Sequence, residues 1–287
     1  MKVCLLLLSL ILPTLAFSQS KALVHGQAMK LDKSTGKMLI SGQVDGYDVK
    51  KEMRFQSDRL ELLRDTKTDE ISFAQVNGDV VVTQGLEYAV FDHGVYQRSL
   101  SLLTMKGHLI LGNDQSRIEG DRAVYDTELE KVSLLPLPSQ QLKFLFHQKN
   151  PDEPDNPTPI TGVADEVWLF RELKKAILQG HVEVNDPTEP SQFKSGRVVV
   201  FFDSENQLDE MTASGGFHMT QPGRSSNSRR AVLNYNTRLI TLLGNAKVQQ
   251  IGEGEVQGER VEMHMDVKKG FIRGKRQKPI RIEIPLN

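Results

Sequence analysis

The chain has 287 residues, with 36 basic and 37 acidic side chains, and 38% of its residues are hydrophobic. This length suits one large domain or two of ordinary size. The balanced charge gives no general attraction to nucleic acid or anionic membranes, so we expect no nucleic-acid partner. The only cysteine is Cys4, which excludes disulfides, cysteine nucleophiles and thiolate metal sites from the rest of the chain.

Residues 1–18 have the pattern of a secretion signal. Lys2 precedes an almost unbroken apolar run over residues 3–12, and Ala16 and Ser18 place small residues at the −3 and −1 positions. The run of about 15 apolar residues is shorter than the roughly 20 needed to span a bilayer. We therefore predict cleavage after Ser18 and a periplasmic location, with an uncleaved membrane anchor as the alternative.

The rest of the chain alternates apolar and polar residues with period two. Arg59-Leu60-Glu61-Leu62, Val182-Glu183-Val184 and Phe217-His218-Met219 are examples. This period is typical of strands with one buried face and one solvated face. The best helix candidate, residues 166–178, can also be read as two strands with a turn at 172–175. The sequence therefore predicts an all-β protein.

A Gly-x-apolar unit recurs six times, starting at Gly42, Gly78, Gly107, Gly180, Gly215 and Gly244. The intervals are 36 and 29 residues in the first trio and 35 and 29 in the second, which indicates a duplicated module. We expect these glycines in turns between short strands.

A second unit alternates with the first and contains an arginine, preceded in three copies by an acid. The copies are Ser57-Asp58-Arg59-Leu60, Gly120-Asp121-Arg122-Ala123, Ser195-Gly196-Arg197-Val198, Arg229-Arg230-Ala231-Val232 and Gly258-Glu259-Arg260-Val261. We expect each copy at the start of a strand, with its charges in a cross-strand ladder on the solvent face.

Between the trios, Leu142, Phe144 and Phe146 alternate as in a strand. Four prolines follow within residues 151–159, which argues against a paired strand there. We therefore predict a first β module over residues 19–147, a Pro-rich loop over 148–159 and a second β module over 160–287.

Three segments resemble the OstA-like repeat of the lipopolysaccharide-transport family that includes LptA, the N-terminal domain of LptD and, more loosely, LptC. They are Gly120-Asp121-Arg122-Ala123-Val124-Tyr125-Asp126, Leu243-Gly244-Asn245-Ala246-Lys247-Val248-Gln249 and Gly258-Glu259-Arg260-Val261. The resemblance covers roughly residues 40–135 and 160–273. It implies an open-edged β-jellyroll of repeated short antiparallel strands, with a groove for lipid A acyl chains. It also implies lipopolysaccharide and LptC-like and LptD-like jellyrolls as partners, joined through edge strands, and the open edges would also allow homo-oligomers. The chain is longer than a typical LptA, and the Pro-rich loop is an insertion relative to the family pattern.

The alternating apolar residues are the candidate lipid contacts. They are Leu60, Leu62, Val80, Val82, Leu109, Leu111, Val182, Val184, Val198, Val200, Phe217, Met219, Leu233, Val248, Val261 and Met263. Acyl chains need such a non-directional apolar surface, but a packed β-sandwich core has the same pattern, and this alternative stays open. The candidate phosphate contacts are Lys275, Arg276 and Lys278. Alternatively, this basic stretch is an edge strand protected from aggregation by its charges.

No catalytic pattern is present in the sequence. None of the seven histidines has metal-ligand spacing, and nucleotide-binding and nucleophile motifs are absent. His108 and His181 follow a repeat glycine, where we expect them on the surface. We predict no enzyme activity, no metal and no cofactor, and a lipid carrier toward the outer membrane. The alternative is a periplasmic β-scaffold, or a membrane-anchored LptC-like assembly subunit that does not carry lipid.

Overall fold

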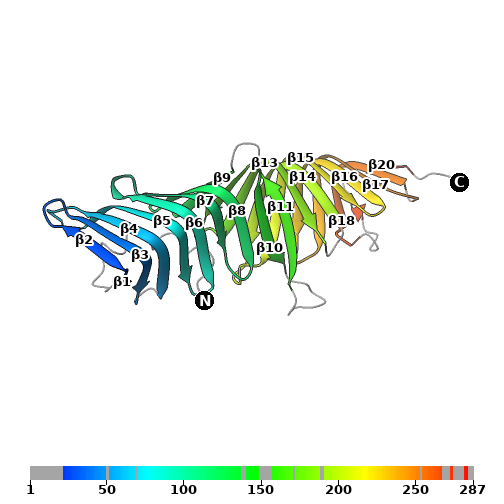
Figure 1. The fold of residues 1–287 in the computed structure, drawn as a ribbon. Coiled ribbons are helices and arrows are strands. Elements are labelled where there is room, and N and C mark those ends of the chain that lie inside the picture. Colours follow the sequence, from blue (N-terminus) through cyan, green and yellow to red (C-terminus); the bar gives the residue numbers. More distant parts are fainter. Residues whose placement is uncertain are drawn as a thin grey trace. The chain divides into compact units, whose positions relative to one another are not determined.

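The computed structural model describes residues 22–49, 52–68, 70–136, 140–148, 157–170, 172–187, 191–252, 254–266, 272–273 and 281–283 (Figure 1). The predicted signal peptide and the candidate phosphate contacts Lys275, Arg276 and Lys278 lie outside these residues. Within them the protein is built from strands, and the one helical element is the short 3-10 turn η1 (Arg98–Leu100). The prediction of an all-β fold is confirmed.

The chain forms two compact units, Met1–Leu142 with Trp168–Leu173, and Lys143–Val167 with Lys174–Asn287. The strands of the first unit are β1 (Ala22–His25), β2 (Ala28–Asp32), β3 (Lys37–Asp48), β4 (Met53–Arg64), β5 (Ile71–Gln84), β6 (Glu87–Gln97), β7 (Leu102–Gly112), β8 (Ser116–Asp126) and β9 (Lys131–Leu135). Strands β3 to β9 form an antiparallel meander, and β1 and β2 both pair with the free side of β3.

The second unit repeats this arrangement. Its strands are β11 (Thr158–Ala164), β13 (Lys175–Asp186), β14 (Ser191–Phe202), β15 (Leu208–Gln221), β16 (Arg224–Asn234), β17 (Leu239–Gln250), β18 (Gly254–His264), β19 (Ile272–Arg273) and β20 (Arg281–Glu283). Strand β11 pairs with β13, the meander runs from β13 to β18, and β19 and β20 pair with β18. Strands β10 (Leu142–Gln148) and β12 (Glu166–Phe170) each include residues of both units.

Two local predictions for the middle of the chain are confirmed, and one is wrong. Residues 142–146 lie in β10, and the 166–178 segment forms two strands, β12 and β13, separated by a turn that includes residues 172–174. Pro159, however, lies inside β11 and not in a loop. It is the second residue of the strand, before the register with β13 begins at Thr161, so its missing N–H costs no bond in that ladder.

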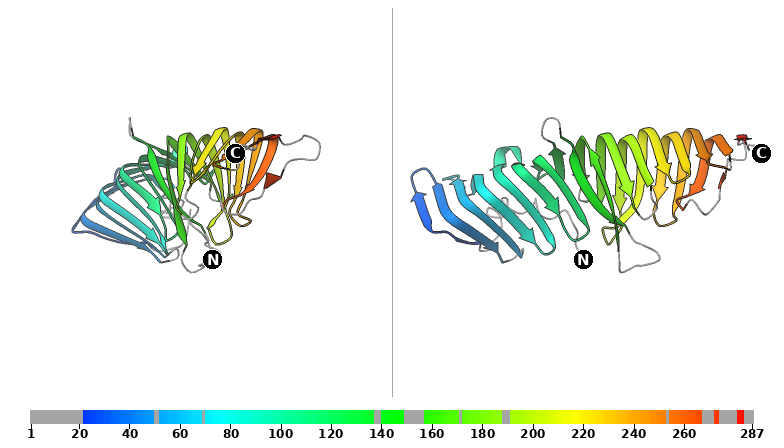
Figure 2. Two further views of the ribbon diagram at one scale, coloured as in Figure 1. Left: turned by 90° about the vertical axis from the view of Figure 1, so that its right-hand side faces the viewer. Right: turned by 45° about the vertical axis from the view of Figure 1, so that its right-hand side comes forward.

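The repeat glycines are not in turns, contrary to our expectation. All six lie inside strands of 11 to 14 residues, where the register shifts by a β-bulge. At each bulge two successive residues have positive φ, as in Gly78 at +79° with Asp79 at +40° and Gly180 at +74° with His181 at +39°. Glycine tolerates this conformation best, and Asp, His and Asn are among the most tolerant of the other residues. Two short strands in the sequence are therefore one long, bent strand (Figure 2).

The arginine-containing units also lie inside strands and not at their starts. Each faces a bulge in the glycine-containing strand. At that point the arginine-containing strand has one residue fewer than the bulged strand, so the buried positions of the arginine-containing strand change parity. In β4 the buried residues are Met53, Phe55 and Ser57 before this point and Leu60 and Leu62 after it. The two repeat units are thus the two sides of one bend.

Candidate functional site

The candidate site is the inner face of each unit, because all sixteen predicted inward residues are buried. In the first unit these are Leu60, Leu62, Val80, Val82, Leu109 and Leu111, and none is more than 7% exposed. In the second unit they are Val182, Val184, Val198, Val200, Phe217, Met219, Leu233, Val248, Val261 and Met263, none more than 4% exposed. Their neighbours point outward, as a period of two requires: Glu183 is half-buried and His218 is exposed.

The predicted set omits about two thirds of the buried apolar residues, for two reasons. In the glycine-containing strands, alternation continues on the N-terminal side of the bend, as in Leu103 and Met105 before Gly107. In the arginine-containing strands the parity changes at the bend. In β14, Phe193 and Ser195 are buried before the bend and Val198 after it. Phe193 packs on Phe217 with ring centroids 5.4 Å apart. The first group could have been found by reading the alternation in both directions from each glycine.

The interior of the second unit is rich in flexible apolar side chains. Met211, Met219, Met263 and Met265 are all at most 4% exposed. The hydroxyl of buried Tyr235 lies 3.7 Å from the sulfur of Met211. Burial raises the pKa of Tyr235 well above its usual value. Methionine adapts to irregular apolar shapes, so this interior can adjust its packing.

In each glycine-containing strand, the row of inward side chains ends in a polar residue six positions after the repeat glycine. These residues are Asp48, Gln84, Asn113, Asp186, Gln221 and Gln250. Asp48, Asp186 and Gln221 are at least nine-tenths buried, and Gln148 donates a 3.2 Å hydrogen bond to Asp186. The duplication therefore extends to the polar ends of the strands, with Asp in the first position of both trios and Gln in the second.

The two ends of the strands meet in the second unit. We call the strand ends at Gln221, Arg224 and Gln250 the distal rim, and those at Asn234, Leu239 and His264 the proximal rim. Gln221 Nε2 donates a 2.8 Å hydrogen bond to the carbonyl oxygen of Met265, one residue beyond β18. Ser226 and Met263, from opposite sides of the bends, are also in contact, with Oγ 3.6 Å from Sδ. The bent sheet therefore folds over its own apolar face, and the line where the rims meet is the mouth of the interior.

Most charged residues lie on the outer faces, as predicted. The arginines of two of the arginine-containing units, however, pair within their own strands and not across strands, Arg59 with Glu61 and Arg260 with Glu262. Cross-strand pairs include Lys37 with Glu61 at 2.6 Å and Lys194 with Glu183 at 2.6 Å. The hydrogen bond from Lys37 is the main reason that the pKa of Glu61 lies below its usual value. Such exposed pairs contribute about 0–1 kcal/mol each.

His108 and His181 are exposed at the bends, which confirms the prediction of surface positions. His108 Nδ1 lies 2.8 Å from Asp92, and His181 Nδ1 lies 2.7 Å from Asp165. The hydrogen bond to the aspartate raises the pKa of each histidine above its usual value. Each aspartate also faces the glycine before its histidine, so the pair belongs to the structure of the bend.

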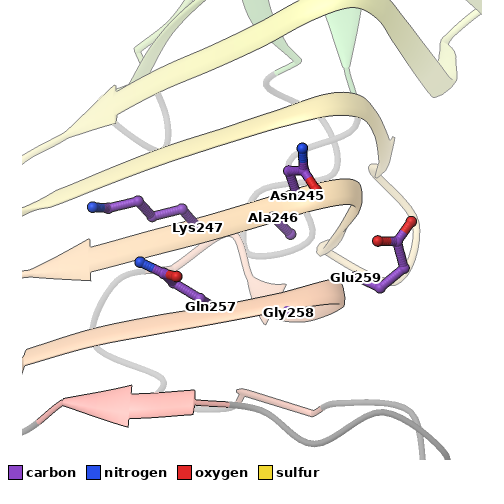
Figure 3. Close-up of a pocket in the computed structure, with 6 residues that line it drawn as sticks. All are labelled: Asn245, Ala246, Lys247, Gln257, Gly258 and Glu259. Atoms are coloured by element: carbon purple, nitrogen blue, oxygen red, sulfur yellow. The ribbon is translucent and has the colours of Figure 1, made fainter.

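A separate depression of about 390 Å³ lies beside the bend of β17 and β18 (Figure 3). Its lining residues are Asn245, Ala246, Lys247, Gln257, Gly258 and Glu259. Most of these are polar or charged, so this depression does not have the chemistry of an acyl-chain site.

Among the described residues, no group of three or more His, Cys, Asp or Glu side chains has a metal-binding arrangement. The same part of the chain contains no helix long and apolar enough to cross a membrane.

Comparison with protein families decides the relationship. Residues 23–131 and 163–269, about three quarters of the chain, match the model of the family described as LptA/(LptD N-terminal domain) LPS transport protein. This protein belongs to that family. The LptA-like resemblance and the β-jellyroll fold expected from it are thus confirmed, and the family is one of lipopolysaccharide-transport proteins.

The chain was also compared with solved structures and with curated protein sequences. Among solved structures, this LptA-family chain is similar to LptH of Pseudomonas aeruginosa, described as the LptA homologous periplasmic component of the conserved lipopolysaccharide transport device. The identity is 16% and the TM-score 0.36, over 42% of this chain and 87% of LptH. A search of curated protein sequences gave no significant match.

Proposed function

We propose that this LptA-family protein carries lipopolysaccharide through the periplasm by holding lipid A acyl chains against the inner faces of its jellyroll units. The observation that supports this function best is the bent sheet, which turns a continuous row of Val, Leu, Phe and Met side chains toward its own interior. Each methylene removed from water contributes about 0.8 kcal/mol. An interior that takes in even part of one acyl chain would retain it.

Transport also needs partners, and we propose that these join at the sheet edges. The first unit ends in β1 and β2, whose described side chains are largely exposed and include Leu23, Met29 and Leu31 at 52%, 64% and 49%. An exposed strand edge can accept a further strand through backbone hydrogen bonds. LptC-like and LptD-like jellyrolls, or a second copy of this chain, would supply that strand.

We also propose that the protein is exported by a signal peptide cleaved after Ser18 and that it has no enzymatic role. Mass spectrometry of the mature protein tests the first point. A chain beginning at Gln19 supports cleavage, whereas one that retains Met1 supports an anchored, LptC-like subunit.

Photo-crosslinking in cells tests lipid carriage directly. A crosslinking amino acid is placed at one inward residue at a time and at its outward neighbour as a matched control. The pairs are Val182 with Glu183, Phe217 with His218, and Met263 with Glu262. We expect labelled lipopolysaccharide at the three inward positions and none at the outward ones.

The same burial also fits a second function, a β-scaffold with a fully packed interior. In that case no inward position captures lipid, and carriage by this protein is refuted. Capture at inward and outward positions alike would also count against an interior site.

A further inference from the structure

Arg224 is a cation buried at the mouth of the second unit. It is the first residue of β16 and only 6% exposed. Its Nε donates a 2.8 Å hydrogen bond to Oε1 of Gln221. Its Nη2 donates to the backbone carbonyl oxygens of His264 at 2.8 Å and Met265 at 3.0 Å. The guanidinium thus lies between the distal and proximal rims.

The hydrogen-bonded partners of this guanidinium are all neutral oxygens. Burial lowers the pKa of Arg224, and the charge of Asp266 acts in the opposite direction as the lesser cause. Removing a guanidinium from water costs several kcal/mol, and neutral carbonyl groups offset less of that cost than an anion would. A closure of the rims by hydrogen bonds alone would not require a charge.

The first unit shows that the fold does not require a cation at this place. Arg224 follows the repeat glycine Gly215 by nine residues, and Glu87 follows Gly78 by nine. Both residues are the first of their strand, both are buried, and both pair in register with the glutamine six residues after the glycine. The duplicated position is therefore acidic in the first unit and basic in the second.

We propose that Arg224 is the contact for a phosphate group of an amphiphile whose acyl chains lie in the interior of the second unit. This assignment rests on the proposed function, because it takes the interior as the acyl-chain site. Since Nε and Nη2 donate to the rims, the N–H groups of Nη1 are the donors that would meet the phosphate oxygens. Burial at the edge of an apolar surface strengthens such a charge-assisted contact. The mouth is where the headgroup of a chain held inside would lie. Glu87 would disfavour phosphate at the equivalent place in the first unit.

Calorimetric titration of the purified full chain tests this assignment with three probes. They are dodecyl phosphate, monolauroylglycerol as its neutral counterpart, and inorganic phosphate. We expect the wild-type protein to bind dodecyl phosphate about 10- to 100-fold more tightly than monolauroylglycerol, and inorganic phosphate far more weakly than either. R224Q should lose this preference and retain its affinity for monolauroylglycerol. R260Q, which removes an exposed arginine from the outer face of β18, should leave both affinities unchanged.

Each other outcome overturns the assignment. If R224Q loses affinity for both amphiphiles by the same factor, Arg224 acts only in holding the rims together. If inorganic phosphate binds as tightly as dodecyl phosphate, the site takes a free anion and not a headgroup. If R224Q does not fold, the wild-type preference decides, because equal affinity for the two amphiphiles excludes a phosphate contact. Wild-type protein that binds neither amphiphile would refute acyl-chain binding itself, which separates that failure from the failure of the assignment of Arg224.

Discussion

Arg224 donates a 2.8 Å hydrogen bond to the backbone carbonyl of His264, although the two residues lie at opposite ends of their strands. Arg224 pairs in register with Gln250, and Gln250 pairs with Gly254 at the start of β18. His264 lies ten residue steps along β18 from Gly254, which is about 33 Å in a straight strand. The contact is possible only because β16, β17 and β18 bend at their bulges. The enclosure of the apolar face thus depends on those bends.

The bends make specific glycines more important than others with the same backbone conformation. Gly78, in the bulge of β5, and Gly252, in a hairpin turn, both have φ of +79°. A Cβ atom on Gly78 would lie 2.7 Å from the Cβ of Asp58, whereas one on Gly252 would have no atom within 4 Å. We expect G252A to cost about 1 kcal/mol for the left-handed backbone, and G78A about 1–3 kcal/mol more. Thermal denaturation followed by circular dichroism measures both, and equal losses would contradict this role of the bulge.

The interior should respond to truncation far more than the outer face. Phe217 is 2% exposed and packs on Phe193, while His218, the next residue, points outward. We expect F217A to destabilise the protein by about 3–5 kcal/mol and H218A by at most about 0.5 kcal/mol. Urea denaturation of the two variants measures the difference. A small effect of F217A would mean that the side chain is not packed in the interior.

The closure of the mouth should depend on Gln221. Its amide donates to Met265 and accepts from Arg224, so Q221A removes both bonds and leaves the buried guanidinium with fewer acceptors. We expect Q221A to lower the free energy of unfolding by about 1–3 kcal/mol. The exposed Gln249 on β17 is the control, and Q249A should cost at most about 0.5 kcal/mol. Faster amide hydrogen exchange near Met265 in Q221A, and not in Q249A, would locate the effect at the mouth.

The histidine pairs at the bends predict a pH dependence with a definite sign. Asp165 raises the pKa of His181 in the folded state above its ordinary value of 6.5. The protonated pair therefore contributes its full stabilisation below about pH 6.5, and this contribution is lost as the pH rises through the raised folded-state value. NMR titration should show that D165N lowers the pKa of His181 and leaves that of His108 unchanged, while D92N does the reverse. An unchanged pKa of His181 in D165N would show that the pair does not form in solution.

The sequence by itself determined which side chains face inward within each short alternating run, but not across the bends, where the parity changes in β4 and β14. Alternation is a local property, since successive side chains of a strand point to opposite faces wherever the strand lies. This is why all sixteen inward residues, including Val182 and Met263, could be assigned before the fold was known. The spacing of the glycines likewise revealed the two trios.

Only the tertiary structure decided whether Gly78 and its equivalents lie in turns or in bends. A glycine with positive φ suits both, and the difference depends on whether the neighbouring strand continues its hydrogen-bonding ladder past that point. The position of Arg224 was equally hidden, because its contacts with His264 and Met265 lie 40 and 41 residues away. They depend on the summed bend of three strands, which no local pattern encodes.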